Sequence, residues 1–566
     1  MRLPETATEL AGAAWADFLP RYEELANAPL DEGTLEEWLH DWSRLEELIT
    51  EAASLAMIAY SCDTGDPEKQ AAHLRFSTEV LPNAEEQSIR LAGRLVELGV
   101  VPPGLETTVA RFKASIAIFR EANVPLFSEL EGMAARYQQI TGGMLAEWEG
   151  ESRPLPQLAP FLQEQDRRVR ERAYRAMVAP YLEQRTALAG LFDEMLERRQ
   201  RVARQAGFRD FLSYSFVAKH RFDYTPADCA RFHDAVEAVV VPAEVRVLAA
   251  RRERLGLPEL RPWDLTVNPY RAEPLRPFAD GAELADQARR LFANLDPVLG
   301  AQIGLMIDEG LLDLDSRKGK APGGYCDTLH VRGRPFIFMN ASGVLEDVTT
   351  LLHEAGHAFH AFAAHHLPYL WQRHPGAEAA ELASMSMEFL AGAHLGPPAG
   401  MLDPRDAAIA RLDHLEHALA SLTHIAAVDA FQAWLYTSPD AADAAARDAA
   451  WLRIRDRFDR GVDWTGLTAE RTVRWYRQLH IFQYPLYYIE YGIAQLGALQ
   501  IWSNHRRDGA AALEAYRRFL ALGATRPLPE LYRAAGASLV FDPGGMRPLV
   551  EMVEEELERL RAIASG

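Results

Sequence analysis

The sequence predicts a mostly α-helical protein with one small β-sheet near the middle of the chain. Its 566 residues are 48% hydrophobic and 25% charged, which is ordinary for a soluble globular protein. Apolar residues recur at helical spacing along most of the chain, and only two stretches interrupt this pattern. We find no fixed-period repeat, so we expect one large helical body of two lobes rather than a solenoid.

The predicted helices follow from apolar periodicity and from capping signals. The segment 34–60 opens with Thr34 as a helix N-cap and Glu37 three residues later, the pattern of a capping box. Comparable periodicity predicts further helices at about 67–99, 160–206, 226–254, 280–298, 405–437, 440–460, 485–505 and 543–563.

Two stretches break the helical pattern. Residues 257–279 hold five prolines, which predicts a long connection. Residues 323–340 hold aromatic and β-branched residues around a glycine-containing turn, which predicts a small hairpin or sheet.

Charge and cysteine content exclude several classes of function. The net charge of -21 argues against nucleic acid or an anionic membrane as the main partner. Three scattered cysteines without a CxxC pair argue against a thiolate zinc site and fit a reducing compartment. The first 20 residues lack the apolar core of a secretory signal, and no apolar run is long enough to span a bilayer. We therefore expect a cytoplasmic enzyme.

The stretch TTLLHEAGHAFHAF (349–362) contains an HExxH motif on a helix expected at about 345–366. His353 and His357 are four residues apart and share one helix face, so both imidazoles can bind one metal ion. Glu354 is rotated by about 100° from His353, where it can act as a general base on a water. Gly356 lies on the metal side, where the lack of a side chain allows another backbone to approach.

A third ligand must lie outside this stretch. The metzincin pattern would place a histidine at position 363, which is Ala363. His360 shares the face of His353 but lies one turn further along. We expect it to support a ligand or to pack, because adjacent turns of a straight helix do not readily give three ligands to one ion.

The predicted helix 376–395 is apolar nearly all round, yet it carries Glu381 and Glu388 on one face. A buried carboxylate requires a metal ion or a hydrogen-bonded partner. We expect Glu381 to be the third ligand, because two histidines and a glutamate form a known catalytic zinc set. Glu388 then accepts a hydrogen bond from a ligand histidine. Glu378 is the alternative ligand.

Two further segments contain candidate substrate-binding residues. The segment 480–491 is expected to turn at Pro485 and then to start a helix that carries Tyr487, Tyr488 and Tyr491. The hydroxyls of these tyrosines can stabilise an oxyanion or contact substrate. Aromatic packing is the alternative. The strand 335–340, with Phe338 and Asn340, can pair with an extended peptide if its edge is exposed, and otherwise is an ordinary buried strand.

Together these motifs resemble the thimet oligopeptidase and oligoendopeptidase F metallopeptidases, with the oligoendopeptidase F branch as the closer match. The HExxH helix is followed, 24 residues after His357, by the glutamate of ELASMSMEFL (381–390). Matching segments are KGKAPGGYCDTLHVRGRPFIFMNASG (318–343), HIFQYPLYYIEYGIA (480–494) and, more weakly, FREANVPLFSELE (119–131).

The resemblance implies a helical body whose two lobes flank a deep channel for short unfolded peptides. It implies one Zn²⁺ per chain, with ligands that match His353, His357 and Glu381, and a catalytic glutamate that matches Glu354. Substrate-contacting residues of the family match three further positions, namely His480, Tyr484 and Tyr491. The interval from His480 to Tyr484 is one residue shorter than in the thimet oligopeptidase branch.

We therefore predict a zinc-dependent oligoendopeptidase with an N-terminal helical region at 1–170 and a catalytic domain at 171–566. Its partners are short peptides, and the sequence leaves the oligomeric state open. One alternative is a zinc carboxypeptidase or dipeptidase on a similar helical frame. A second is a helical binding protein with a structural metal site, in which His360 or His374 fills the fourth position.

Overall fold

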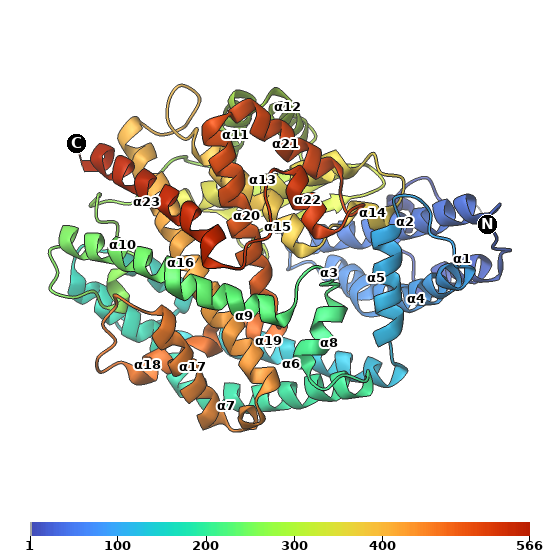
Figure 1. The fold of residues 1–566 in the computed structure, drawn as a ribbon, viewed down its shortest axis with the longest axis horizontal. Coiled ribbons are helices and arrows are strands. Elements are labelled where there is room, and N and C mark those ends of the chain that lie inside the picture. Colours follow the sequence, from blue (N-terminus) through green and yellow to red (C-terminus); the bar gives the residue numbers. More distant parts are fainter. Residues whose placement is uncertain (1–2, 566) are drawn as a thin grey trace. The chain divides into compact units, whose positions relative to one another are not determined.

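Helices make up most of the computed structural model, which describes residues 3–565, and strands occupy two small sheets (Figure 1). This confirms the predicted fold class. The chain divides into two compact units, each built from separate stretches of sequence. Unit 1 comprises Met1–Ala117, Leu275–Ala407 and Gly497–Leu539, and unit 2 comprises Ile118–Pro274, Ala408–Leu496 and Val540–Gly566. The predicted division at residue 170 and the deep channel stay predictions.

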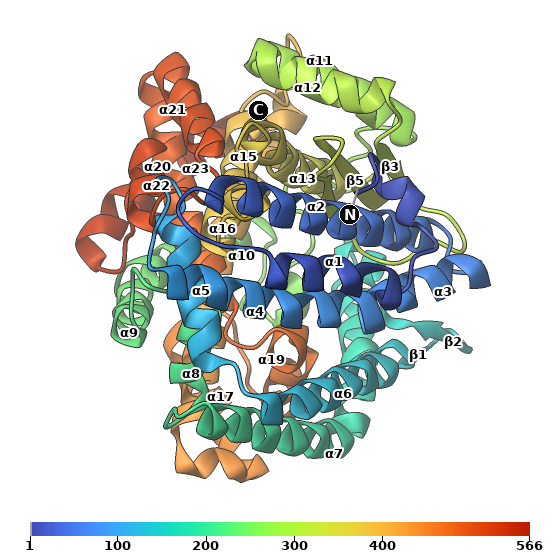
Figure 2. The ribbon, with the colours of Figure 1, turned by 90° about the vertical axis from the view of Figure 1, so that its right-hand side faces the viewer.

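Unit 1 combines a helical N-terminal region with a three-stranded sheet and the helices around it. Its helices are α1 (Trp15–Asn27), α2 (Leu35–Cys62), α3 (Pro67–Arg75), α4 (Leu81–Leu98), α5 (Glu106–Ile118, whose last residue begins unit 2), α11 (Gly281–Leu295), α12 (Pro297–Asp308), α13 (Leu345–Ala364), α14 (Leu370–Arg373), α15 (Ala377–Gly392), α21 (Gly509–Ala521) and α22 (Leu528–Ala534). Figure 2 shows α1, α2 and α4 side by side, and their buried aromatic side chains, Phe18, Tyr22, Trp38 and Trp42, form the core of this region.

Unit 2 is helical apart from one hairpin, β1 (Leu145–Trp148) and β2 (Glu151–Pro154). Its helices are α6 (Val124–Gly142), α7 (Arg167–Gln205), α8 (Phe211–Ala218), α9 (Pro226–Ala235), α10 (Val241–Arg254), α17 (Ala444–Phe458), α18 (Thr468–Thr472), α19 (Leu479–Gln483) and α23 (Pro543–Ser565). Two helices contribute residues to both units, namely α16 (Pro404–Thr437) and α20 (Tyr488–Arg507). Among the helices of residues 3–565, none is long and apolar enough to cross a bilayer.

Two of the predicted helices are interrupted by a π-helical turn. The helix predicted at 67–99 is formed by α3, the π turn Phe76–Val80 and α4, and the helix predicted at 226–254 has the π turn Val236–Val240. In both cases a proline, Pro82 or Pro242, occupies the second position of the following helix. Proline cannot donate a backbone hydrogen bond, so the ladder shifts by one residue next to it.

Other helix boundaries differ from the prediction where a local signal prevails. The helix predicted at 160–206 begins only at Arg167, because the Asp166 side chain caps it and a 3₁₀ segment (Leu155–Gln163) precedes it. The helix predicted at 280–298 ends at Leu295, and Asp296 caps a separate helix, α12. At α2, Thr34 occupies the N-cap, but its side chain makes no capping hydrogen bond.

The predicted hairpin at 323–340 is present and gains a third strand. Strands β4 (Tyr325–Leu329) and β5 (Arg334–Ala341) pair antiparallel, and β3 (Leu312–Asp315) pairs parallel with the other side of β5. Of the two alternatives for 335–340, this middle position favours the ordinary buried strand, because β5 has a neighbour on each side at Ile337 and Phe338. The sheet lies against α13.

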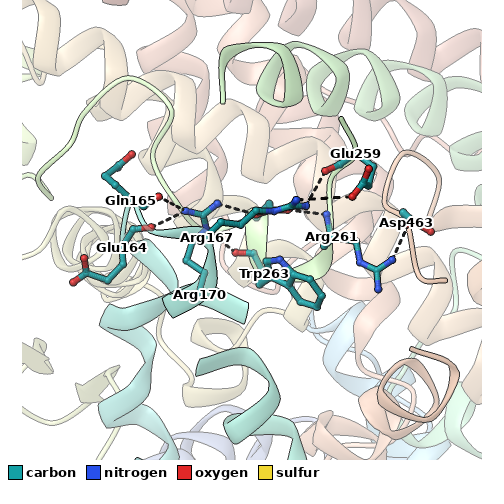
Figure 3. A network of polar contacts seen from close by, with 9 residues as sticks. Glu164, Gln165, Arg167, Arg170, Glu259, Arg261, Trp263 and Asp463 are labelled. Atoms are coloured by element: carbon teal, nitrogen blue, oxygen red, sulfur yellow. Dashed lines mark hydrogen bonds and ion pairs between the residues drawn. The ribbon is translucent and has the colours of Figure 1, made fainter. Parts of the chain in front are cut away.

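In unit 2, the part of the predicted proline-rich connection (257–279) that precedes Leu275 is anchored by a buried ion network (Figure 3). The carboxylate of Asp264 is fully buried and binds Arg170 Nη2 and Arg167 Nη2, each at 2.8 Å. It also accepts the backbone N–H of Arg261 at 2.9 Å. Arg170 is itself buried, so its positive charge depends on this carboxylate.

Replacing Asp264 by alanine is expected to destabilise the protein by about 3–5 kcal/mol, because the buried Arg170 loses its partner. The matched control is Glu171→Ala, which removes a solvent-exposed pair with Arg175 on the same helix and should change stability by about 1 kcal/mol or less. Urea unfolding followed by circular dichroism measures both. Equal shifts of the two midpoints would show that the network does not hold the connection.

Candidate active site

Helices α13 and α15 bring three potential metal ligands together. His353 Nε2 lies 3.4 Å and His357 Nε2 lies 3.9 Å from Glu381 Oε2. One ligand atom from each of His353, His357 and Glu381 lies within 4.8 Å of the other two. Among residues 3–565, these three side chains form the group of histidine, cysteine or acidic residues that could hold a metal ion. Ligands of one tetrahedral zinc ion at 2.0–2.1 Å would be roughly 3.4 Å apart, so the donor set fits this metal.

Hydrogen bonds orient two of these ligands. Glu388 Oε1 lies 2.7 Å from His353 Nδ1 and accepts a hydrogen bond from it, which leaves Nε2 facing Glu381 as the nitrogen available to a metal ion. Ser384 Oγ donates to Glu381 Oε2 at 3.0 Å. Burial alone would lower the pKa of His353, but the hydrogen bond and charge of Glu388, together with Glu381, raise it to about 9.

Glu354 follows His353 on α13 and is buried against the sheet. Burial raises the pKa of its carboxyl to about 7, with the positive charge of His353 opposing the shift and the negative charge of Glu381 adding to it. The backbone N–H of Cys326 on β4 donates a hydrogen bond to this carboxylate. A carboxylate whose pKa is near neutrality suits proton transfer at physiological pH.

Gly356 allows the close approach of α13 and α15. A Cβ atom at this position would lie 2.5 Å from Ser384 Cα and 2.6 Å from the carbonyl oxygen of Ala383, both on α15. Tyr516 on α21 donates from its hydroxyl to the same Ala383 carbonyl at 2.8 Å. The α15 backbone at Ala383 and Ser384 is therefore in close contact with α13, and Ala383 also accepts a hydrogen bond from α21.

The alternative ligands lie outside the donor group. His360 is buried beside Phe519, with their ring centroids 5.5 Å apart. The Nε2 atoms of His374 and His330 are 2.9 Å apart. Glu378 is buried near the N-terminus of α15, and its negative charge acts on Arg111.

The predicted tyrosine segment lies in unit 2. His480 is at the start of α19, and its ring lies near those of four tyrosines, with centroid distances of 4.8–6.2 Å to Tyr484, Tyr487, Tyr488 and Tyr491. Tyr484 is 57% exposed.

Buried arginines hold the backbone of this segment. Arg199 on α7 donates to the carbonyl oxygens of Ile481 and Phe482. Leu486, in the turn before α20, has a positive φ of 60°, a strained conformation for a branched side chain. Its carbonyl accepts from Arg221, and its N–H donates to Gln432 at 2.8 Å.

Phe338, a predicted substrate-binding residue, lies in β5. Its side chain is fully buried and stacks on Tyr325 with 4.9 Å between ring centroids. Asn340 instead fixes the glycine-rich loop before β4, because its side-chain amide donates to the carbonyl oxygens of Ala321 and Gly323. A role of Phe338 and Asn340 in substrate binding stays a prediction.

Comparison with known proteins supports one family. The model of peptidase family M3 matches residues 161–543, more than half of the chain. Oligopeptidase PepF of Bacillus subtilis (strain 168) is 22% identical over 417 residues, which covers 71% of this chain and 59% of PepF, less than two thirds of its length.

Two solved structures extend the similarity over nearly the whole fold. The structure of PZ peptidase A with an inhibitor has a TM-score of 0.86 at 28% sequence identity and covers 99% of this chain and 98% of that chain. An X-ray structure assigned to oligoendopeptidase F has a TM-score of 0.85, also at 28% identity and with the same coverage. The chain belongs to peptidase family M3, as its resemblance to the oligoendopeptidase F branch predicted.

Proposed function

We propose that the protein is a zinc-dependent oligoendopeptidase that hydrolyses internal bonds of short unfolded peptides. The donor group of His353, His357 and Glu381, with Glu354 beside it on the same helix, supports this function most directly. Two imidazole nitrogens and one carboxylate oxygen form a known catalytic zinc set that leaves a position for water. PepF and oligoendopeptidase F, as their names state, act on oligopeptides.

The three ligand side chains would hold one Zn²⁺ per chain, with Glu388 and Ser384 supporting them. When bound, zinc supplies a Lewis acid that polarises a peptide carbonyl and makes water more acidic. The Glu354 carboxylate accepts a proton from the attacking water and then delivers it to the nitrogen of the leaving amine. Its burial keeps bulk water from competing for this proton.

Side-chain donors of the tyrosine segment would stabilise the negative charge that develops on the carbonyl oxygen. We assign this role to Tyr491, with Tyr484 or His480, on the family resemblance of the segment 480–494. The exposed position of Tyr484 suits contact with a substrate. Tyr488 is a further candidate for substrate contact.

Replacing Glu354 by glutamine should lower kcat by about 10²–10⁴-fold while zinc content stays at one per chain, because the amide cannot accept the proton. The matched control is Glu346→Gln, the same change at an exposed position of α13, which should leave kcat unaltered. Cleavage of an end-blocked, internally quenched peptide measures activity, and elemental analysis measures zinc. End-blocked peptides also separate an endopeptidase from a carboxypeptidase or dipeptidase, which needs a free terminus.

Replacing Glu381 by alanine should abolish zinc retention after dialysis, because only the two histidines remain as ligands. Glu378→Ala provides the control on the same helix and should retain one zinc ion per chain. If Glu381→Ala retains zinc, or if Glu378→Ala loses it, the third ligand is Glu378 and not Glu381.

Replacing Gly356 by alanine should destabilise the protein by about 1–3 kcal/mol, because the new methyl group meets the backbone of α15 and forces the two helices apart. Zinc affinity should fall with it, since the ligands come from both helices. Gly392→Ala, on α15 with no atom within 4 Å of the added Cβ, is the matched control and should bind zinc normally. Thermal unfolding and a competitive zinc titration measure the two effects, and equal behaviour of both variants would contradict the role of Gly356.

A further inference from the structure

We infer that a chain of polar side chains in unit 2, running from Arg455 through His424 and Gln478, fixes His480 as the neutral tautomer with its proton on Nε2. Gln478 is then a positioning residue for the reaction. The tautomer follows from the contacts within unit 2, while its use in substrate binding rests on the proposed function.

The chain begins at a group that can only donate hydrogen bonds. Arg455 is buried, and its Nε and Nη2 donate to the carboxylate of Asp459. Its remaining nitrogen, Nη1, lies 3.3 Å from His424 Nδ1. A guanidinium has no acceptor, so His424 Nδ1 must be the unprotonated nitrogen of this contact.

The neutral His424 ring therefore carries its proton on Nε2. This assignment agrees with its surroundings, because burial and the positive charges of Arg455 and Arg474 lower the pKa of His424 to about 3. His424 Nε2 lies 3.0 Å from Gln478 Oε1 and donates to it. The oxygen of the Gln478 amide is thus fixed on the side of His424.

The nitrogen of the same amide faces the other way and has two acceptors. It donates to His480 Nδ1 at 3.0 Å and to the hydroxyl oxygen of Tyr488 at 2.6 Å. His480 Nδ1 is consequently the acceptor of its ring, and the ring proton must be on Nε2. Because the hydroxyl oxygen of Tyr488 accepts here, its own O–H proton is directed elsewhere.

The surroundings of His480 favour a neutral ring. Burial lowers the pKa of His480 to about 4. The rings of Tyr484, Tyr487, Tyr488 and Tyr491 lie near it. Lys219 Nζ lies 5.2 Å from the centroid of the Tyr487 ring.

Charged groups lie further back along the chain, around His424. They are Arg455, Arg474, the carboxylate of Asp459, which binds both arginines, and Glu244, whose carboxyl has its pKa raised to about 7 by burial.

The tautomer decides what His480 can offer a peptide. A proton on Nε2 makes this nitrogen a donor to a carbonyl oxygen or to the oxyanion that forms from it. The opposite tautomer would present a lone pair to the same oxygen and repel it. Gln478 thus determines the chemistry of His480 without contacting the substrate.

The variant Gln478→Glu tests this arrangement, because it reverses the hydrogen bond to His480. A carboxylate accepts a proton from His480 Nδ1, which raises the pKa of the ring and, in the neutral ring, removes the proton from Nε2. At about pH 8, kcat should fall by about 10²-fold, the usual cost of one lost oxyanion donor. Toward about pH 5.5 the imidazolium carries both protons, so the ratio of the variant's kcat to that of the wild type should rise.

Gln483→Glu is the matched control. It introduces the same charge three residues beyond His480 on α19, where Gln483 donates only weakly to the Ala134 carbonyl oxygen at 3.4 Å. Its kcat ratio to the wild type should not change with pH. A pH-independent ratio for Gln478→Glu, like that of the control, would overturn the inference.

A measurement without substrate tests the tautomer directly. In wild-type protein with ¹⁵N-labelled histidine rings, the signal of His480, assigned by its loss in His480→Gln, should show a protonated Nε2 and an unprotonated Nδ1 near pH 7. The opposite pattern, or a mixture of tautomers, would contradict the inference. Absence of peptidase activity with the expected tautomer would instead refute the proposed function alone.

Discussion

The close packing of α13 against α15 is the constraint on which the candidate site depends. The HExxH motif offers two potential ligands and the proposed base from one helix, but the proposed third ligand, Glu381, and the carboxylate that orients His353, Glu388, come from the other. Because Gly356 has no side chain, the two helix backbones lie close enough for Glu381 to reach both histidines. Tyr516 donates a hydrogen bond to the α15 backbone at Ala383. A side chain at position 356 would move α13 and α15 apart and so increase the distance between Glu381 and the two histidines. Metal binding at the proposed site therefore depends on backbone packing as much as on the identity of the ligands.

A second theme is that buried arginines organise the irregular backbone of unit 2. Arg170 ties the proline-rich connection to α7, Arg199 holds α19 by its carbonyl oxygens, and Arg221 binds the carbonyl of the strained Leu486. These guanidinium groups satisfy carbonyls that no helix or sheet can satisfy. Arg455 acts in the same way on side chains instead of carbonyl groups. Its N–H donor determines which nitrogen of His424 is protonated, and His424 in turn determines the orientation of the Gln478 amide.

Sequence patterns predicted the helical fold, the hairpin and the three residues that form the donor group. They succeeded because helical periodicity is local and because a carboxylate on an apolar helix, as at Glu381, is visible without a structure. They failed where a partner distant in sequence decides. The sequence left open whether 335–340 is an edge strand, and the pairing of β3 with β5 makes it the central strand, in which Phe338 is buried. The sequence also contains local signals for helix interruptions, such as Pro82 at the second position of α4 and Asp296 at the cap of α12. The prediction missed these interruptions because the helical periodicity continues across them.

The chain through Gln478 shows why such features escape a linear reading. Gln478 and His480 are neighbours in sequence, but His424 and Arg455 come from α16 and α17, and nothing in their spacing connects them. Only the unambiguous donor at the far end, Arg455, assigns every proton between it and His480. A histidine tautomer is therefore a property of the folded network, and the proposed role of Gln478, two positions before His480, depends on side chains that two other helices contribute.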